Sequence, residues 1–279
     1  MATANASGAL DGLDAQAIQR GIEATGQRAG VEVLETCGST NTELLSRAAM
    51  AEPVLLFAEE QTAGRGRRGR RWHADPQSSL MFSLRWEFAG DAGRLRGLSL
   101  ACGVAVARAL RSLGAHSVSL KWPNDLLASP GKQSAKLGGM LVETKSSGGR
   151  IGAVIGIGIN CRRMPGLEAR LSRAVSSLEE CMAKLPPRNE IAAAVGSGLL
   201  QAMARFDAAG FEAFRPQWEA MHAHQGEALK VRVADGRVIA GIADGLAPDG
   251  ALVLRTRRGL QSIHNGTVVR ESARARSAA

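Results

Sequence analysis

A basic, glycine-punctuated stretch at residues 61–72, called the Arg loop below, constrains the fold of this chain more than any other feature. Five of the seven positions from 65 to 71 are Arg, and Gly64, Gly66 and Gly69 interrupt the charges. Glycine lets the backbone wrap closely around a ligand and present its N–H groups. Arginine supplies planar, permanently charged forks that suit carboxylate and phosphate. We therefore expect a loop that is mobile when empty and becomes ordered around an anion.

Two familiar nucleotide-binding motifs can be weighed against the Arg loop. Its glycines match G-x-G-x-x-G, and Glu87 lies near the place where a ribose-binding acid would be sought. A dinucleotide site requires a helix to open at the third glycine, but here the chain continues into Leu80–Leu84, which reads as a strand. A Walker loop is excluded because no Gly-Lys-Ser/Thr follows. A solvated or nucleic-acid-binding Arg loop stays open as the alternative.

Length and composition favour a globular protein without membrane association. With 279 residues, 45% of them hydrophobic, the chain can form one large domain with a real core and a small second one. No apolar run approaches the ~20 residues that cross a bilayer, and the first residues lack the pattern of a signal peptide. The cysteines at positions 37, 102, 161 and 181 form no C-x-x-C pair, which predicts reduced thiols and a cytoplasmic protein.

The net charge of +9 suits nucleic acid, a membrane surface or an acidic protein partner. Single-strand binders usually interleave aromatic residues for base stacking. With no Tyr, six Phe and four Trp, that signature is thin here. His222 and His224 come nearest to a metal pair, but no Cys or acidic cluster lies beside them. We expect them to be surface histidines, and we expect no metal ligands from the protein.

Hydrophobic periodicity predicts strands and helices mixed along the first 225 residues. Expected strands cover 31–34, 53–57, 79–88, 118–122 and 151–160, and expected helices cover 14–25, 95–113, 189–206 and 211–222. Thr40–Glu43 has the form of a capping box that opens a helix through about Met50. From Leu167 onward the pattern is helical, interrupted by Pro186 and Pro187.

After about Gly226 the pattern changes to short strands separated by glycine turns. The expected strands are 229–233, 238–243, 251–256, 261–264 and 267–270, with Asp-Gly or Asn-Gly turns at 235, 249 and 265. This pattern predicts a small all-β barrel of about 45 residues.

Four further motifs place polar residues at the ends of predicted elements. They are Ser39-Thr40-Asn41, Lys121-Trp-Pro-Asn-Asp125, Lys136-Leu-Gly-Gly-Met-Leu-Val-Glu143 and Val154-Ile-Gly-Ile-Gly-Ile-Asn160. The first three also have a plain structural explanation: helix capping for Ser39 and Thr40, an Asx turn at Asn124, and a solvated side chain for Lys136.

Together with the Arg loop, these motifs occur in the order and approximate spacing of biotin protein ligases. Over roughly residues 30–272 the sequence resembles a biotin–[acetyl-CoA-carboxylase] ligase. The resemblance implies an α+β fold, in which a mixed-sheet catalytic domain of the biotin/lipoate ligase type precedes a small SH3-like β-barrel. It implies an N-terminal extension at 1–29, a catalytic domain at 30–225, the barrel at 226–272 and a tail at 273–279.

The same resemblance assigns a site, residue by residue. It gives catalytic roles to Lys136, Arg67 and Asp125, with Asp125 facing the incoming lysine. Residues expected to bind biotin or ATP are Ser39, Thr40, Asn41, Gln61, Gly64, Arg65, Arg67, Arg68, Trp72, Asn124, Lys136, Gly138, Gly139, Asn160 and Arg270. Gln61 suits the ureido ring of biotin because one amide offers both a donor and an acceptor. Where the family often has Gly-Glu-Val, this chain has Gly266-Thr267-Val268, which weakens the assignment of a role to the barrel.

The reaction implied has two steps: biotin and Mg-ATP form biotinyl-5′-AMP, and a lysine of a biotin carboxyl carrier domain then takes the biotinyl group. Substrates and cofactors are thus biotin, ATP and Mg²⁺, and the partner is a biotin-dependent carboxylase. Some family members carry an N-terminal helix-turn-helix; about 25 residues before Val31 are too few for one, so we expect an enzyme without specific DNA binding. A homodimer through the central sheet is compatible with the resemblance. The alternatives are a lipoate-type ligase and a non-enzymatic nucleic-acid-binding protein.

Overall fold

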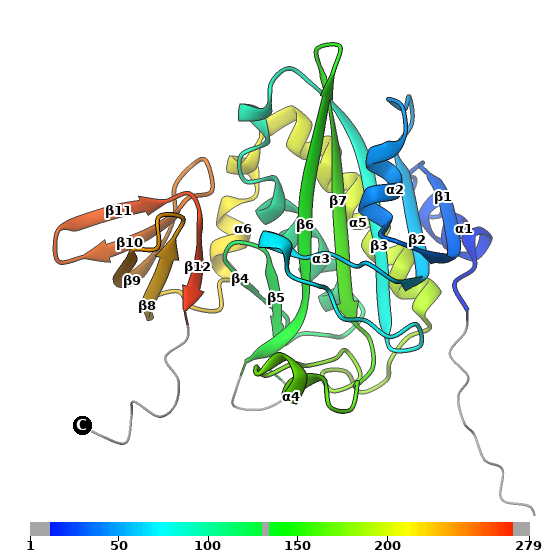
Figure 1. The fold of residues 1–279 in the computed structure, drawn as a ribbon. Helices are drawn as coiled ribbons and strands as arrows, with labels where there is room; N and C mark the ends of the chain where they lie inside the picture. Colours follow the sequence, from blue (N-terminus) through cyan, green and yellow to red (C-terminus); the bar gives the residue numbers. More distant parts are fainter. Residues whose placement is uncertain (1–11, 130–133, 270–279) are drawn as a thin grey trace, which may run out of the picture.

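The computed structural model describes residues 12–129 and 134–269, which form two β-sheets and the helices that pack on them (Figure 1). The first sheet contains β1 (Gly30–Cys37), β2 (Val54–Gln61), β3 (Ser79–Ala89), β4 (Ser119–Lys121), β5 (Asp125–Ala128), β6 (Ala135–Ser147) and β7 (Arg150–Asn160). The second contains β8 (Ala228–Val233), β9 (Val238–Leu246), β10 (Leu252–Thr256), β11 (Gly259–Ile263) and β12 (Gly266–Val269).

Helices surround the first sheet. The α-helices are α1 (Ala15–Glu23), α2 (Thr40–Ser46), α3 (Leu98–Ser112), α4 (Leu167–Leu171), α5 (Arg188–Ala209) and α6 (Arg215–Ala220). Short 3-10 turns are η1 (Arg67–Gly69), η2 (Ala92–Leu95) and η3 (Phe211–Ala213).

The first sheet is mixed, with strand order β1-β2-β3-β7-β6-β5-β4. β1 and β2 run parallel, whereas the remaining neighbours are antiparallel. The long strands β3, β7 and β6 lie at its centre (Figure 1). β6 and β7 form a hairpin, with Ser147 opposite Arg150.

Alternation along β2 separates the two faces of this sheet. Leu55 and Phe57 join the main core, which contains residues of α1, α3 and α5. Val54 and Leu56 point the other way and form a smaller cluster with Leu44 of α2. α2 therefore covers the face opposite the long helices, and the beginning of α2 is held against the middle of the sheet.

The second sheet has strand order β11-β10-β9-β8-β12 and is antiparallel throughout. Several bonds fasten the two sheets together. Leu120 of β4 donates to the carbonyl of Met221 at 2.8 Å and accepts from the amide of Ala223 at 2.8 Å, so the segment after α6 covers the edge strand β4. Trp122 Nε1 donates to the Gly250 carbonyl at 3.2 Å.

The predicted fold class is confirmed, and the structure corrects three local predictions. α2 has Ser39 as its N-cap and runs from Thr40 to Ser46, so it begins one residue earlier and ends four residues earlier than the capping box implied. The Thr40 hydroxyl cannot cap the helix because it bonds Gln61 and Ser83 instead. The helical pattern after Leu167 is wrong beyond Leu171, where the chain turns back to pair with β6.

The third correction concerns His222, which is 8% exposed and not a surface residue. Its ring packs 4.6 Å from that of Trp218, centroid to centroid. The domain boundaries at residues 30, 226 and 272 stay predictions.

Candidate active site

A cavity of about 650 Å³ lies on the α2 face of the first sheet. Its walls come from the start of α2, the Arg loop, β5, β6, β7, the segment after α4, and β12 of the second sheet. Eight of the described lining residues are Arg or Lys and one is acidic; they are Arg65, Arg67, Arg68, Arg70, Arg71, Arg173, Lys121, Lys136 and Asp125. Such a cavity suits a ligand with several negative charges.

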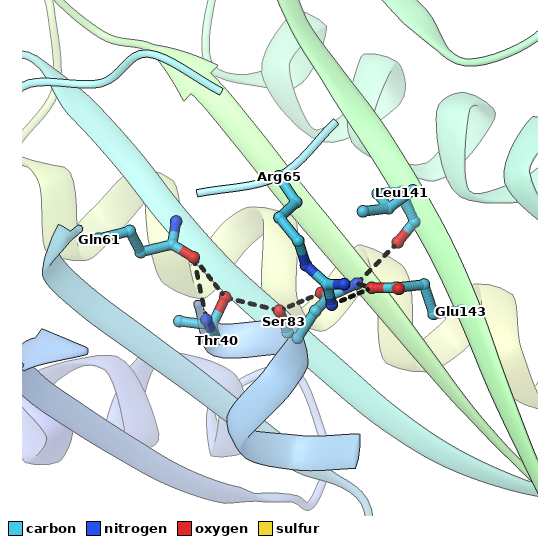
Figure 2. A network of polar contacts seen from close by, with 7 residues as sticks. Thr40, Gln61, Arg65, Ser83, Leu141 and Glu143 are labelled. Carbon is cyan, nitrogen blue, oxygen red and sulfur yellow. Dashed lines mark hydrogen bonds and ion pairs between the residues drawn. The ribbon is translucent and has the colours of Figure 1, made fainter. Parts of the chain in front are cut away.

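Hydrogen bonds organise one end of the cavity, where α2 begins (Figure 2). Gln61 Oε1 accepts from the Thr40 amide at 2.9 Å, and the Thr40 hydroxyl lies 2.7 Å from that of Ser83. Ser83 donates to Asn41 Oδ1 at 2.6 Å, and Asn41 Nδ2 donates to Glu143 Oε2 at 2.8 Å. These hydrogen bonds fix the orientation of side chains that present donors and acceptors to the cavity, an arrangement that suits a small polar ligand.

The Gly-Ile alternation of β7 creates the room for these groups. The isoleucines enter the main core, and Gly156 and Gly158 face the cavity. A Cβ on Gly156 would lie 2.3 Å from Asn41 Oδ1, and one on Gly158 would lie 2.4 Å from the Trp72 ring. Only glycine at positions 156 and 158 leaves room for the side-chain amide of Asn41 and the indole of Trp72 to pack on the sheet.

The centre of the cavity holds an ion pair between Lys136 on β6 and Asp125 on β5. Both side chains are largely buried, at 14% and 22% exposure. Burial lowers the pKa of Lys136, and the adjacent carboxylate of Asp125 acts in the opposite direction. The ammonium also lies 5.6 Å from the centroid of the Trp72 ring, within the range of a cation–π contact.

The Arg loop closes over this centre by contacts with three different elements. Arg65 pairs with Glu143 of β6 at 2.9 Å, and Arg67 donates to Asn124 Oδ1 at 3.2 Å. Arg68 donates to Thr267 Oγ1 of β12 at 3.1 Å. Burial, followed by the charge of Arg68, lowers the pKa of the Arg67 guanidinium. The loop thus presents partly desolvated cations to the cavity.

The structure brings most of the predicted site residues to this cavity. Those that line it are Ser39, Thr40, Asn41, Gln61, Arg65, Arg67, Arg68, Trp72, Asn124, Asp125, Lys136 and Gly139.

Four predicted residues are placed otherwise. Gly64 does not line the cavity, and its carbonyl accepts from the Trp72 amide at 2.9 Å. Gly138 packs against the backbone of β7, where a Cβ would lie 2.6 Å from the Gly158 carbonyl. Asn160 is 3% exposed and its side-chain amide donates to the Ser176 carbonyl at 3.0 Å, so its side chain holds the backbone of a neighbouring segment and does not line the cavity. Arg270 lies outside the described residues.

Sequence reasoning missed Ser83, Glu143, Arg173 and Thr267. Ser83 is an ordinary strand residue that nothing in its local sequence marks. Thr267 was noted only as a departure from the family's Gly-Glu-Val and was given no role. Glu143 ends the Lys136–Glu143 motif and carried no role of its own. Arg173 was assigned to a helix that ends before it.

Other classes of site receive no support from the described parts of the chain. Across residues 12–129 and 134–269, no three or more His, Cys, Asp or Glu side chains gather in a way that could hold a metal ion. None of the helices within these residues has the length and apolar character needed to cross a membrane.

Comparison with known proteins agrees with this geometry. Residues 33–160 match the biotin/lipoate A/B protein ligase family, and residues 224–270 match the biotin protein ligase C-terminal domain. The chain is 36% identical to the bifunctional ligase/repressor BirA of Escherichia coli over 80% of this chain and 68% of that protein. It is 31% identical to a biotin–[acetyl-CoA-carboxylase] ligase of Paracoccus denitrificans, over 83% and 96% of the two chains.

Among solved structures, the biotin protein ligase of Aquifex aeolicus in complex with biotin and ATP superposes with a TM-score of 0.72. That likeness covers 86% of this chain and 99% of the other, at 27% identity. A mixed sheet with a cationic cavity and a small attached β-sheet defines an enzyme of the biotin/lipoate ligase class. Within this class, the chain belongs to the biotin protein ligase family.

Proposed function

We propose that this enzyme attaches biotin to a lysine of a carrier protein in an ATP-dependent reaction that passes through biotinyl-5′-AMP. The observation that carries the proposal is a single cavity in which a hydrogen-bonding end adjoins a buried Lys136–Asp125 pair and many cations. The C-terminal match and the named relatives favour biotin over lipoate. A nucleic-acid-binding Arg loop explains less, because Arg65, Arg67 and Arg68 line the cavity.

In the first step, a biotin carboxylate oxygen forms a bond to the α-phosphorus of ATP. The bond from that phosphorus to its bridging oxygen breaks, and pyrophosphate leaves with the electron pair. Two anions meet here, so the step needs cations that screen both and stabilise the charge that gathers on phosphorus. Lys136, held by its ion pair with Asp125, would fill this role, and Arg65 and Arg67 would add charge from the loop.

Biotin would occupy the end formed by Ser39, Thr40, Asn41 and Gln61. The amide and the hydroxyl of Thr40 both donate to Gln61 Oε1 there, and the carbonyl oxygen of a cyclic urea can accept from the same donors. The Trp72 ring above Gly158 would cover the bound adenylate and exclude water.

Mg²⁺ fits this site as a companion of ATP. It prefers oxygen ligands from phosphate and water with one or two carboxylates, and Asp125 is the one acidic residue among the described lining residues. Bound there, the ion would neutralise phosphate charge.

In the second step, the amine of the carrier lysine attacks the carbonyl carbon of the mixed anhydride and AMP departs with the electron pair. Asp125 would hold the incoming ammonium and accept its proton once Lys136 faces the phosphate. Arg67, fixed to Asn124, would retain the adenylate until the carrier arrives.

The partner we propose is the biotin carboxyl carrier domain of a carboxylase. A net charge of +9 would speed encounter with an acidic carrier. We further propose a cytoplasmic protein that binds no specific DNA and no membrane, and that is compatible with a homodimer.

The direct test incubates the enzyme with ATP, Mg²⁺, biotin and a carrier domain, followed by mass spectrometry of the carrier. We expect one added biotinyl group on one lysine, dependent on ATP. A carrier with that lysine changed to Arg serves as the control. Transfer of lipoate in preference to biotin, or no modification, would refute the proposal.

A further inference from the structure

The side chain of Asn41 bridges three strands of the first sheet. Ser83 of β3, Gly156 of β7 and Leu141 of β6 occupy one row of paired residues across these strands. A Cβ on Gly156 would lie 2.3 Å from Asn41 Oδ1, so the glycine leaves this place in the row to the Asn41 side chain. Asn41 therefore lies directly on the sheet, with one end toward β3 and the other toward β6.

The groups on the β6 side decide how the Asn41 amide is oriented. It bonds the Leu141 carbonyl at 3.3 Å and Glu143 Oε2 at 2.8 Å. The same carboxylate pairs with Arg65 at 2.9 Å (Figure 2). A backbone carbonyl and an ionised carboxylate can only accept hydrogen bonds. Asn41 must therefore turn its NH₂ group toward β6 and its carbonyl oxygen toward β3.

That orientation sets the direction of two hydroxyl groups. Asn41 Oδ1 can only accept, so the Ser83 hydroxyl donates its one proton there, at 2.6 Å. The Thr40 hydroxyl lies 2.7 Å from the Ser83 oxygen, and Thr40 is the donor because Ser83 has no second proton. The longer contact of the Thr40 hydroxyl with Gln61 Oε1, at 3.3 Å, uses the same proton. Only the lone pairs of the Thr40 oxygen remain for a further partner.

These groups are shielded from solvent. Thr40, Asn41 and Ser83 are 2%, 3% and 0% exposed. In such surroundings a hydrogen bond is stronger than in water and an unpaired member is costly, so the direction of the bonds is firmly held. Thr40 and Asn41 are among the described residues that line the cavity, whereas Ser83 and Glu143 are not. Residues outside the lining thus determine what Thr40 offers to a ligand.

We propose that Glu143 and Ser83 are positioning residues that make the Thr40 hydroxyl an acceptor for an N–H of the bound ring. This inference rests on the proposed function. The Thr40 amide donates to Gln61 Oε1 at 2.9 Å, so the same residue offers a donor beside this acceptor. A cyclic urea presents a C=O next to an N–H and matches both. A ring with oxygen in place of that N–H would meet the lone pairs of Thr40 and be rejected.

The test measures by calorimetry how the full chain binds biotin and its two cyclic carbamate analogues, in which oxygen replaces one or the other ureido N–H. For the parent, we expect at least one analogue to bind about 10- to 100-fold more weakly than biotin, the effect of an unpaired buried group. In Ser83→Ala the Thr40 hydroxyl can turn its proton to the ring oxygen, so this ratio should fall to about threefold or less. Ser79→Ala is the matched control, because Ser79 is a buried serine of the same strand outside the cavity lining, and it should keep the parent ratio.

Glu143 is tested with a pair of variants. Glu143→Gln keeps an oxygen that can accept from Asn41, so it should keep the parent ratio. Glu143→Leu leaves the Asn41 NH₂ group only the longer bond to the Leu141 carbonyl, so the ratio should fall at least about threefold. A residue that merely supports the fold would weaken the binding of biotin and of its analogues alike and leave the ratio unchanged.

Several results would overturn this role of Glu143 and Ser83. They are a parent that binds both carbamates as tightly as biotin, an unchanged ratio in Ser83→Ala, an equal fall in Ser79→Ala, or equal ratios in Glu143→Gln and Glu143→Leu. If Ser83→Ala does not fold by thermal melting, Ser83→Cys repeats the test with a thiol, which is a weak acceptor. A parent that does not bind biotin at all would refute the proposed function itself.

Discussion

Lys136 shows how its surroundings prepare one side chain for chemistry. It lies at the start of β6, paired with Asp125 and beside the Trp72 ring. Burial lowers its pKa, while the carboxylate favours the charged form. The protein thereby keeps a cation in a partly desolvated place, where its attraction for phosphate is stronger than in water.

His222 carries a prediction at the same scale. Burial against Trp218 lowers its pKa from 6.5 to about 4, because the charged ring would lose its hydration. Between these values the unfolded chain binds a proton that the folded chain does not. The contribution of neutral His222 to the free energy of unfolding should therefore be fully present above pH 6.5. It should fall by up to about 3 kcal/mol as the pH drops toward 4.

Urea unfolding at pH 7.5 and pH 5 would measure this effect in the parent and in His222→Gln, whose side chain does not titrate. The parent should lose more stability than the variant between the two pH values. Equal losses in the two proteins would show that His222 does not make this contribution.

Among the elements of the fold, β7 contributes to both the core and the cavity, because isoleucine and glycine alternate along it. Its isoleucines pack beneath the sheet, and its glycines make room for Asn41 and Trp72 above it. One strand thus sets both the stability of the sheet and the depth of the cavity.

Gly158→Ala tests this arrangement. The added Cβ would lie 2.4 Å from the Trp72 ring, so the indole must move away from the sheet. We expect kcat/KM for biotin to fall at least about 10-fold, with about 1–3 kcal/mol lost from stability through overpacking. Gly30→Ala, whose Cβ would make an ordinary 3.4 Å contact, is the matched control. Unchanged biotin kinetics in Gly158→Ala would contradict the role given to this close approach.

The sequence allowed most of these elements to be predicted because their periodicity is local. The strands β3 and β7 and the helices α3 and α5 were anticipated within a few residues. The start of α2 and the segment after α4 were not, because tertiary contacts decided them: Thr40 bonds Gln61 and Ser83, and Ala174 pairs with Lys136. Arg173 could not be placed without that pairing.

At the scale of the whole molecule, the cavity belongs to both sheets. Gly266, Thr267 and Val268 of β12 line it, and Arg68 reaches Thr267. The resemblance placed Arg270 of the barrel at the site, but no residue pattern indicated that Gly266, Thr267 and Val268 would form a wall of the cavity. Such a contact spans 199 positions, and local periodicity carries no signal for it.

Limited proteolysis with trypsin tests whether the Arg loop closes over its ligand. Biotin with Mg-ATP should slow cleavage at 65–71, because the loop cations then contact an anion. Cleavage at Arg257 and Arg258, which are exposed in the turn between β10 and β11, provides the internal control and should be unchanged. Equal rates at 65–71 with and without ligand would contradict a lid.

The proposed reaction requires biotin and ATP to meet at Lys136, and rapid-quench measurement of pyrophosphate release without carrier tests this most directly. The parent should release pyrophosphate only when biotin is present. Lys136→Ala should release it about 10²–10³ times more slowly, the loss expected for one charge-stabilising donor. Release that does not depend on biotin, or a folded Lys136→Ala with the parent rate, would contradict the account.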